Sequence, residues 1–256
     1  MNDIIVSFLG TGTSQGIPVI SSNHPVGNSK DFRDKRLRSS VLLSWGTYNY
    51  VIDCGPDFRY QMLRADVRTL NGVLFTHEHA DHVAGLDDLR PYSFQLGAVP
   101  VYGQKRVLET LAQRFDYIFN DDNKYPGAPS VKQHILENRP FQLSGKTIIP
   151  VLINHGDLKI FGYRVGCFAY LSDVKTVDET EKQKLQGLDV LVLSAIRHKT
   201  HRSHLNLEEA LVLINELKPR ICYLTHISQY LGFHEEVEKD LPPTVRLAYD
   251  GLVLKL

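Results

Sequence analysis

Cysteine is scarce in this chain of 256 residues, which has only Cys54, Cys167 and Cys222. The three are far apart, odd in number and placed in or beside apolar strand patterns. Such a distribution argues against a disulfide framework and favours buried reduced thiols. We therefore expect a cytoplasmic protein. The N-terminal segment MNDIIVSFLG has no basic region before its apolar residues, so we do not expect a cleavable signal.

The sequence also lacks an excess of either charge, because 29 lysines and arginines balance 29 aspartates and glutamates. A formal net charge of zero provides no basic field for nucleic acid, so we do not expect nucleic acid as a partner. No apolar run approaches the roughly 18 residues that span a bilayer, which excludes a membrane protein of that kind. The balanced composition predicts one compact domain, residues 1–256. The oligomeric state stays open, a homodimer included.

What the sequence does contain is a cluster of histidines and an aspartate in the segment THEHADH, residues 76–82. His77, His79, Asp81 and His82 follow an apolar run that predicts a buried strand. Helices are predicted at 81–89 and, as an amphipathic segment, at 104–115. Imidazole and carboxylate ligands suit zinc or manganese, and iron less well, and the absence of a thiolate argues against a closed structural zinc site. The alternative, a histidine-rich surface turn, fits poorly with the apolar residues on both sides.

This pattern, His-x-His-x-Asp-His after a strand, resembles the signature of the metallo-β-lactamase superfamily. The resemblance implies an α/β (α+β) fold, a four-layer αββα sandwich with a dinuclear metal site. It also implies a histidine after a later strand, a bridging aspartate and a last histidine near the C-terminus. His155, Asp173 and His226 stand in that order, each at the end of an apolar run.

The resemblance assigns seven metal ligands, three to each of two divalent ions and one bridge. They are His77, His79 and His155 for the first ion, Asp81, His82 and His226 for the second, and Asp173 for the bridge. Two zinc or manganese ions lower the pKa of a shared water from about 15.7 toward 7, which makes hydroxide available for attack. As a ligand of one ion, Asp81 then takes part in catalysis.

A second histidine-rich segment, residues 197–204, precedes a helix predicted at 207–217. An Asn-x-x-Glu sequence at the start of that helix is typical of a capping box. The resemblance implies a histidine before this helix that contacts the phosphate or serves as acid, and His204 matches it best. A helix N-terminus also favours a phosphate oxygen. His198 and His201 are the rival candidates, and surface roles are favoured for both.

The group of relatives that this chain most resembles opens cyclic ribose phosphates and carries an extra structural zinc. Three cysteines of an irregular loop, here residues 17–37, and a late histidine hold that ion. The corresponding positions are Ser22, His24, Gly27 and Gln229. A single histidine cannot form a tetrahedral site, so we expect no structural zinc in the 17–37 loop.

Charged residues near the predicted strand ends are open to two interpretations. The basic residues Lys35, Arg36 and Arg38 fit a solvated charge run better than a phosphate clamp. Asp53 fits equally well a support for a metal-ligating histidine and an ordinary turn. Asp57 is expected to cap the helix that follows it.

The implied function is that of a metal-dependent hydrolase, and most closely a phosphodiesterase. Its substrate would be a small, cyclic nucleotide- or ribose-type phosphodiester, attacked by a metal-bridged hydroxide. The histidine at position 79 argues against the di-iron redox branch of the superfamily, which usually has a carboxylate there. Two alternatives stay open: a thioester or lactone hydrolase with the same dinuclear site, and a non-catalytic metal-binding domain.

Overall fold

The computed structural model describes residues 3–120, 122 and 124–256, and the chain divides into two compact units. The first unit is formed by residues up to 10, by 38–137 and by 251–256, and the second by 11–37 and 138–250. Each unit is built on one sheet. The single domain expected over residues 1–256 stays a prediction. None of the described helices has the length and apolar character needed to cross a membrane.

The sheet of the first unit has seven strands among the described residues, in the order β15-β1-β2-β3-β4-β5-β6. The pairs from β15 to β3 are antiparallel, and those from β3 to β6 are parallel. The strands are β1 (Ile5–Gly10), β2 (Ser40–Trp45), β3 (Tyr48–Ile52), β4 (Gly72–Leu74), β5 (Val99–Gly103), β6 (Val131–Ile135) and β15 (Val253–Lys255).

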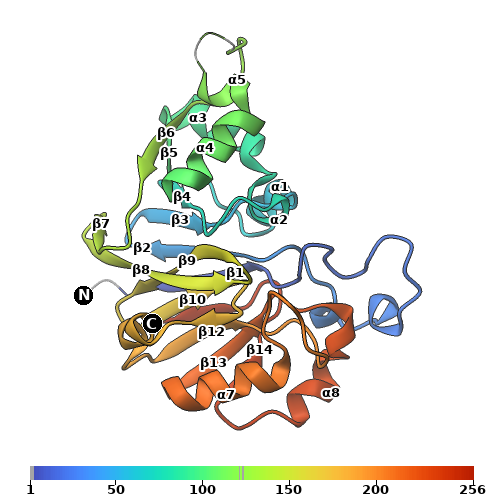
Figure 1. Ribbon diagram of the computed structural model, residues 1–256. Helices are drawn as coiled ribbons and strands as arrows, with labels where there is room; N and C mark the ends of the chain where they lie inside the picture. The colour runs from blue at the N-terminus through green and yellow to red at the C-terminus, as the bar shows by residue number, and fades with distance from the viewer. Residues whose placement is uncertain (1–2, 121, 123) are drawn as a thin grey trace. The chain divides into compact units, whose positions relative to one another are not determined.

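Helices of the first unit follow its parallel strands; α3 and α4 lie beside β5, and α4 also lies beside β6 (Figure 1). The apolar face of α4 packs into a buried cluster with the side chains of Val73 and Val101. The predicted helix at 104–115 is confirmed as α4. The helical elements are α1 (Phe58–Arg64), α2 (Ala80–Val83), η3 (Leu86–Leu89), α3 (Arg90–Leu96), α4 (Lys105–Arg114) and α5 (Asp116–Phe119).

The sheet of the second unit runs β11-β8-β9-β10-β12-β13-β14, and β7 pairs with β8. It is antiparallel from β11 to β10 and parallel from β10 to β14. The strands are β7 (Phe141–Leu143), β8 (Lys146–His155), β9 (Leu158–Val165), β10 (Phe168–Leu171), β11 (Thr176–Val177), β12 (Val190–Ser194), β13 (Ile221–Thr225) and β14 (Val245–Leu247).

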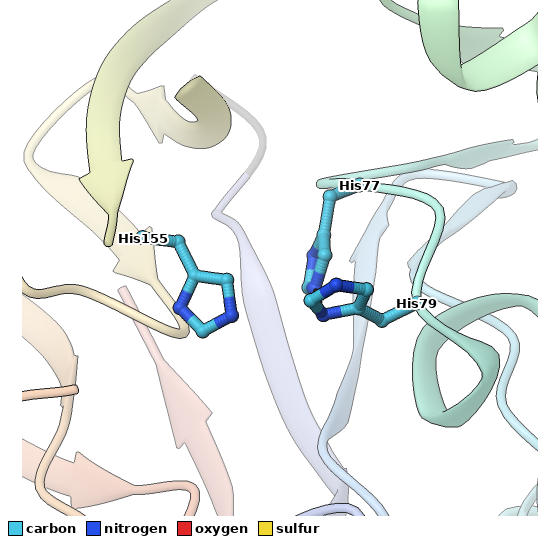
Figure 2. Close-up of side chains that lie close together, drawn as sticks. All are labelled: His77, His79 and His155. Atoms are coloured by element: carbon cyan, nitrogen blue, oxygen red, sulfur yellow. Dashed lines mark hydrogen bonds between the residues drawn. The ribbon is translucent and has the colours of Figure 1, made fainter. Parts of the chain in front are cut away.

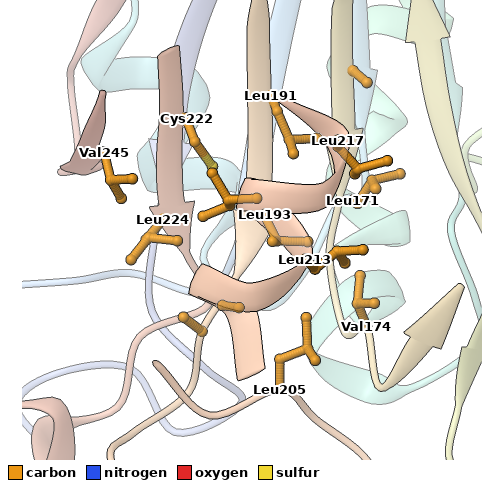
Figure 3. Packing of buried hydrophobic residues seen from close by; sticks show 14 of the residues in the cluster. Leu171, Val174, Leu191, Leu193, Leu205, Leu213, Leu217, Cys222, Leu224 and Val245 are labelled. Atoms are coloured by element: carbon orange, nitrogen blue, oxygen red, sulfur yellow. The ribbon is translucent and has the colours of Figure 1, made fainter. Parts of the chain in front are cut away.

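Helix α7 (Leu207–Leu217) has the bounds that the sequence predicts and lies along β12 and β13 (Figure 1). Its side chains Leu213 and Leu217 pack with Leu193 and Leu224 in one buried cluster (Figure 3). The predicted capping box is present. The other helical elements are η1 (Pro25–Asn28), η2 (Phe32–Asp34), α6 (Glu179–Lys182), η5 (Gln183–Leu185), η6 (Gln229–Leu231) and α8 (His234–Lys239).

Arg36 holds the 17–37 loop to the rest of the second unit. Its guanidinium donates to Thr11 Oγ1 at 2.8 Å, to the Ala248 carbonyl at 2.5 Å and to His234 Nδ1 at 3.1 Å. The side chain is only 3% exposed. The prediction of a solvated charge run is therefore wrong for Arg36, because three acceptors within the fold replace its water.

Two positions equivalent to zinc ligands of the relatives, Ser22 and Gln229, bond to each other through their side chains. The hydroxyl of Ser22 and the amide of Gln229 lie 3.1 to 3.2 Å apart. Nδ1 of His24 accepts from the backbone of Val26, and its ring packs edge-on against Tyr230 at 5.4 Å. The expected absence of a structural zinc stays a prediction.

Asp57 stands at the N-terminus of α1, but its side chain makes no capping hydrogen bond. Its carboxylate instead accepts from the backbone and the guanidinium of Arg38 at 2.8 and 3.0 Å. The capping prediction is therefore wrong. A charged partner outcompetes the amides at the end of the short helix because the charge-assisted bond is the stronger one.

Candidate metal centre

His77 and His79 face each other directly after β4, in the first unit. Nε2 of His77 lies 2.9 Å from Nδ1 of His79, and the rings are nearly perpendicular (Figure 2). The hydroxyl of Thr76 donates to Asp53 and lies 3.0 Å from Nδ1 of His77. That hydroxyl can therefore only accept from His77, so the ring carries its proton on Nδ1. The Nε2 lone pair therefore points toward Nδ1 of His79, the other candidate ligand of this pair.

Asp81 and His82 form a second pair of donor atoms in the same unit. Oδ2 of Asp81 lies 3.1 Å from Nε2 of His82. On the other side of the ring, Nδ1 of His82 lies 2.7 Å from Oδ2 of Asp53. Burial raises the pKa of Asp53, whereas the contacts with His82 and Thr76 act in the opposite direction. Asp53 thus contacts His82 directly and His77 through Thr76. These contacts favour its interpretation as a support for ligating histidines over that of an ordinary turn residue.

Two glycines let the motif approach the turn after β3. A Cβ on Gly55 would lie 2.0 Å from the Asp81 carbonyl oxygen, and one on Gly85 would lie 2.2 Å from the Gly55 carbonyl oxygen. The amide of Gly85 donates to the carbonyl of Cys54 at 2.9 Å. The single helix predicted at 81–89 is therefore wrong: this contact separates α2 from η3, and it fixes Asp81 beside the turn that carries Asp53.

The second unit gathers four more of the predicted residues at the ends of its strands. The candidate ligand atoms of His155, Asp173 and His204 all lie within 4.8 Å of one another. Oδ1 of Asp173 is 3.3 Å from Nε2 of His226 and 3.6 Å from Nδ1 of His204. All four side chains are buried. A carboxylate among three imidazoles has the donor chemistry of a divalent metal site.

Three candidate residues have a left-handed backbone conformation, in which side chains other than glycine are strained. The φ angles are +63° at Asp53, +58° at Asp173 and +56° at His226. Each such residue costs on the order of 1–3 kcal/mol and persists where the surrounding structure holds it, often at functional sites. The sharp turns after β3, β10 and β13 therefore aim these side chains at the strand ends.

The backbone of Ser203 fixes the protonation of His155. Nδ1 of His155 lies 2.9 Å from the Ser203 carbonyl oxygen, which can only accept, so the ring carries its proton there. Its Nε2 then presents a lone pair (Figure 2 shows the ring at the end of β8). Gly156 permits this approach, since a Cβ at that position would lie 3.3 Å from the Ser203 Cβ.

His204 is buried without a hydrogen bond to its Nδ1 from any described residue. Burial lowers its pKa to about 3; Asp173 opposes that shift, whereas His226 and His155 add to it. A neutral ring donates a hydrogen bond but does not hold a transferable proton at pH 7. Of the two roles that the sequence left open, burial therefore favours the phosphate contact over the acid.

The two rival histidines differ in their surroundings. Nε2 of His198 donates to the Leu231 carbonyl at 2.8 Å, which fixes this ring against η6. His201 is half-buried, and its ring centre lies 4.8 Å from that of His204. A surface role predicted for both histidines therefore fits His198 better than His201.

Comparison with known proteins gives three informative likenesses. A family model, the beta-lactamase superfamily domain, matches residues 48–227. The chain is 38% identical over 248 residues to an octanoyltransferase of Porphyromonas gingivalis, over 96% of this chain and 50% of that protein. It is 31% identical over 163 residues to a ribonuclease Z of Bacillus licheniformis, over 62% of this chain and 47% of the other. The chain thus spans about half the length of these curated relatives.

Among solved structures, the chain is similar to a diphosphatase from the PhnP family. The two share 38% sequence identity and a TM-score of 0.93 over 99% of this chain and 97% of that chain. Together with the family model, this likeness confirms the predicted fold, a mixed α/β architecture with two sheets of the metallo-β-lactamase type. The histidine and aspartate clusters described above are compatible with the divalent metals that such a fold implies.

Proposed function

Because the chain belongs to the beta-lactamase superfamily, with the metallo-β-lactamase fold, we propose that it is a hydrolase that binds two divalent metal ions and cleaves small phosphodiesters. The observation that carries the proposal is the set of hydrogen-bond partners at Nδ1 of three histidines. Asp53, Thr76 and Ser203 lie within hydrogen-bond distance of Nδ1 of His82, His77 and His155, so Nε2 is the lone-pair side of each ring, the side suited to a cation. A cluster of that kind is costly to bury unless it binds something.

The proposed ligand set has seven members. It is the set that the family resemblance implies: His77, His79, Asp81, His82, His155, Asp173 and His226. Two divalent ions held by these residues would lower the pKa of a bound water toward neutrality and would offset the negative charge of the phosphate oxygens. Zinc and manganese both fit imidazole and carboxylate donors.

His204 would contact the phosphate. Its buried, neutral ring can donate a hydrogen bond to a non-bridging or leaving oxygen, and such a bond becomes stronger as negative charge develops there. The diphosphatase and the ribonuclease Z among the similar proteins support a phosphoryl substrate. The zero net charge supports a small substrate rather than nucleic acid. The free cysteines Cys54, Cys167 and Cys222 support a reducing, cytoplasmic setting.

The test is the initial rate of hydrolysis of a five-membered cyclic ribose phosphate by protein loaded with manganese or zinc. We expect ring opening that a chelator abolishes. His204→Ala should keep both metals and lower kcat by about 10²–10³-fold, the cost of losing one donor to a developing negative charge, whereas His198→Ala should stay near the wild-type rate. Asp173→Ala should lose metal. Turnover that survives the chelator, or full metal occupancy in Asp173→Ala, would contradict the proposal.

A second candidate is hydrolysis of an acyl thioester. The likeness that favours it is the octanoyltransferase, which matches nearly all of this chain. The same metal-loaded protein should therefore be offered an octanoyl thioester. Metal-dependent release of the thiol, with no turnover of any phosphodiester, would favour this candidate over the first.

A further inference from the structure

The loop that carries His204 also holds His198 and His201, which the proposed chemistry does not use, and His201 is the nearer of the two to the candidate site. The ring of His201 lies 4.8 Å from that of His204 and is tilted by 59°. The ring of His204 in turn lies 4.7 Å from that of His155 and 5.1 Å from that of His226. His201 therefore extends a row of imidazoles that begins at two candidate metal ligands.

The backbone fixes which nitrogen of His201 carries the proton. The amide N–H of Ser203 lies 3.2 Å from Nδ1 of His201. An amide N–H can only donate, so Nδ1 accepts and the neutral ring is protonated on Nε2. Burial, followed by the charge of Arg197, lowers the pKa of His201 and keeps the ring neutral. Within the part of the chain that the structure describes, no group bonds to this Nε2–H.

Ser203 thus orients two rings in opposite senses. Its carbonyl takes the Nδ1 proton of His155, whose Nε2 becomes a lone pair suited to a cation. Its amide occupies Nδ1 of His201, whose Nε2 becomes a donor suited to an anion. A donor of fixed direction beside cation-binding groups is the arrangement that stabilises charge developing on a phosphate.

The surrounding segment is cationic. Residues 197–204 contain Arg197, Lys199 and Arg202 and no acidic residue, although Arg202 pairs at 3.2 Å with Asp157, which lies outside the segment. The guanidinium of Arg197 donates to the carbonyls of Lys199 and Thr200 at 3.1 and 2.8 Å, which shapes the loop around His201. In a chain of zero net charge, this local excess attracts an anion to the place where the Nε2–H is available.

We infer that His201 is a further catalytic residue, which donates a hydrogen bond from Nε2 to an oxygen of the substrate phosphate beside the oxygen that His204 contacts. The inference rests on the proposed function and extends it from one donor to two. It assigns His198 no such part, because the Leu231 carbonyl already occupies its Nε2.

The test compares His201→Leu, which removes the donor, with His201→Gln, whose side-chain amide can place an N–H near the position of the ring Nε2. For bis(4-nitrophenyl) phosphate, we expect kcat/KM to fall about 10- to 100-fold in the leucine variant and to recover in part in the glutamine variant. Both variants should keep the wild-type metal content. His198→Leu is the matched control and should stay within a few-fold of wild type.

Affinity for inorganic phosphate, measured by calorimetry on the manganese-loaded proteins, tests His201 independently of turnover. Wild-type protein that binds phosphate but hydrolyses no diester would refute the proposed function, yet the leucine variant should still bind phosphate about tenfold more weakly. Equal affinity in wild type and the leucine variant, loss of metal from that variant, or no phosphate binding by wild type would each overturn the inference.

Discussion

Asp53 shows how a single carboxylate can organise several ligands of one unit. It accepts from the amide and the hydroxyl of Thr76, each at 2.8 Å, and lies 2.7 Å from Nδ1 of His82. Through Thr76 it also fixes His77. Since supporting partners of this kind set the direction and basicity of metal-ligating rings, Asp53 should matter to affinity without touching a metal.

Asp53→Asn should weaken metal binding about 10- to 100-fold, because one half of the amide presents N–H groups where His82 and Thr76 need acceptors. Competition with a coloured chelator measures the change. The matched control is Asp66→Asn, since Asp66 is exposed and pairs only with the exposed Arg68 among the contacts described. Equal metal affinity in the Asp53 variant and in wild type would show that Asp53 is only a turn residue and does not support the metal ligands.

At the scale of residues, the sequence predicted chemical identity better than protonation. The four candidates of the THEHADH segment gather in one unit, and His155, Asp173, His204 and His226 gather in the other. The roles of Thr76 and Ser203 could not be predicted. Ser203 acts through its amide and carbonyl, which every residue except proline has, so its residue type carries no signal.

The start of α7 is where an element and the candidate site meet. The side-chain oxygen of Asn206 accepts from the backbone N–H of Glu209 at 2.8 Å, and the Glu209 carboxylate accepts from the backbone N–H of Asn206 at 3.0 Å. The side-chain NH₂ of Asn206 donates to the His198 carbonyl. The capping box therefore also anchors the loop that leads to His204.

Asn206→Ala should lower the free energy of unfolding by about 1–2 kcal/mol, because a helix cap and a loop contact are lost together. Urea denaturation followed by circular dichroism measures it. Asn215→Ala is the control: this exposed asparagine lies in the same helix, where alanine is the better helix former, so stability should stay equal or rise slightly. An unchanged midpoint for Asn206→Ala would argue against the cap.

Element prediction succeeded where one period or one cap dominated and failed where distant backbone decided. The helix at 207–217 was predicted with its bounds because the capping box and the apolar face agree. The helix predicted at 81–89 breaks because Gly85 bonds to the Cys54 carbonyl, a contact that no local pattern shows. Buried and exposed residues do not alternate along β6, so its sequence lacks the two-residue period of apolar side chains by which a strand is predicted.

For the molecule as a whole, buried histidines make stability depend on pH. Nδ1 of His234 accepts from Arg36, and its Nε2 donates to Glu238 at 2.7 Å. Burial, with the charges of Arg36 and Arg33, lowers the pKa of His234 to about 4; Asp31 and Asp34 act against that shift. Protonation of Nδ1 would place a positive imidazolium next to the positive Arg36 guanidinium, and the two charges would repel each other.

The stability from neutral His234 should be fully present above pH 6.5 and decrease as the pH falls toward 4, because the unfolded chain takes up the proton first. The loss should be on the order of 2 kcal/mol. Urea denaturation at pH 7.5, 5.5 and 4.5 measures it. His234→Asn retains an acceptor for Arg36 but does not titrate, so its stability should fall less over that range. Parallel curves for the two proteins would contradict this assignment.

The family of the whole chain was within reach of the sequence, and the anchoring of its loops was not. One histidine-aspartate segment and the order of three later residues predicted the fold that the comparisons confirm. The burial of Arg36 depends on Thr11, Ala248 and His234 meeting around it, at up to 212 residues of separation. A basic residue in a polar loop has no local pattern that reports such a partner set.

The two contacts of Ser203 have a consequence for how this loop can vary. Any residue with a backbone N–H and carbonyl can hold His155 and His201 in the same protonation states, so these states do not require the contact of the Ser203 hydroxyl with Nδ1 of His201 at 3.4 Å. The property that persists is the path of the backbone. A comparison of side-chain types would rank this position among the dispensable ones, although it determines which of two neighbouring rings meets a metal and which meets an anion.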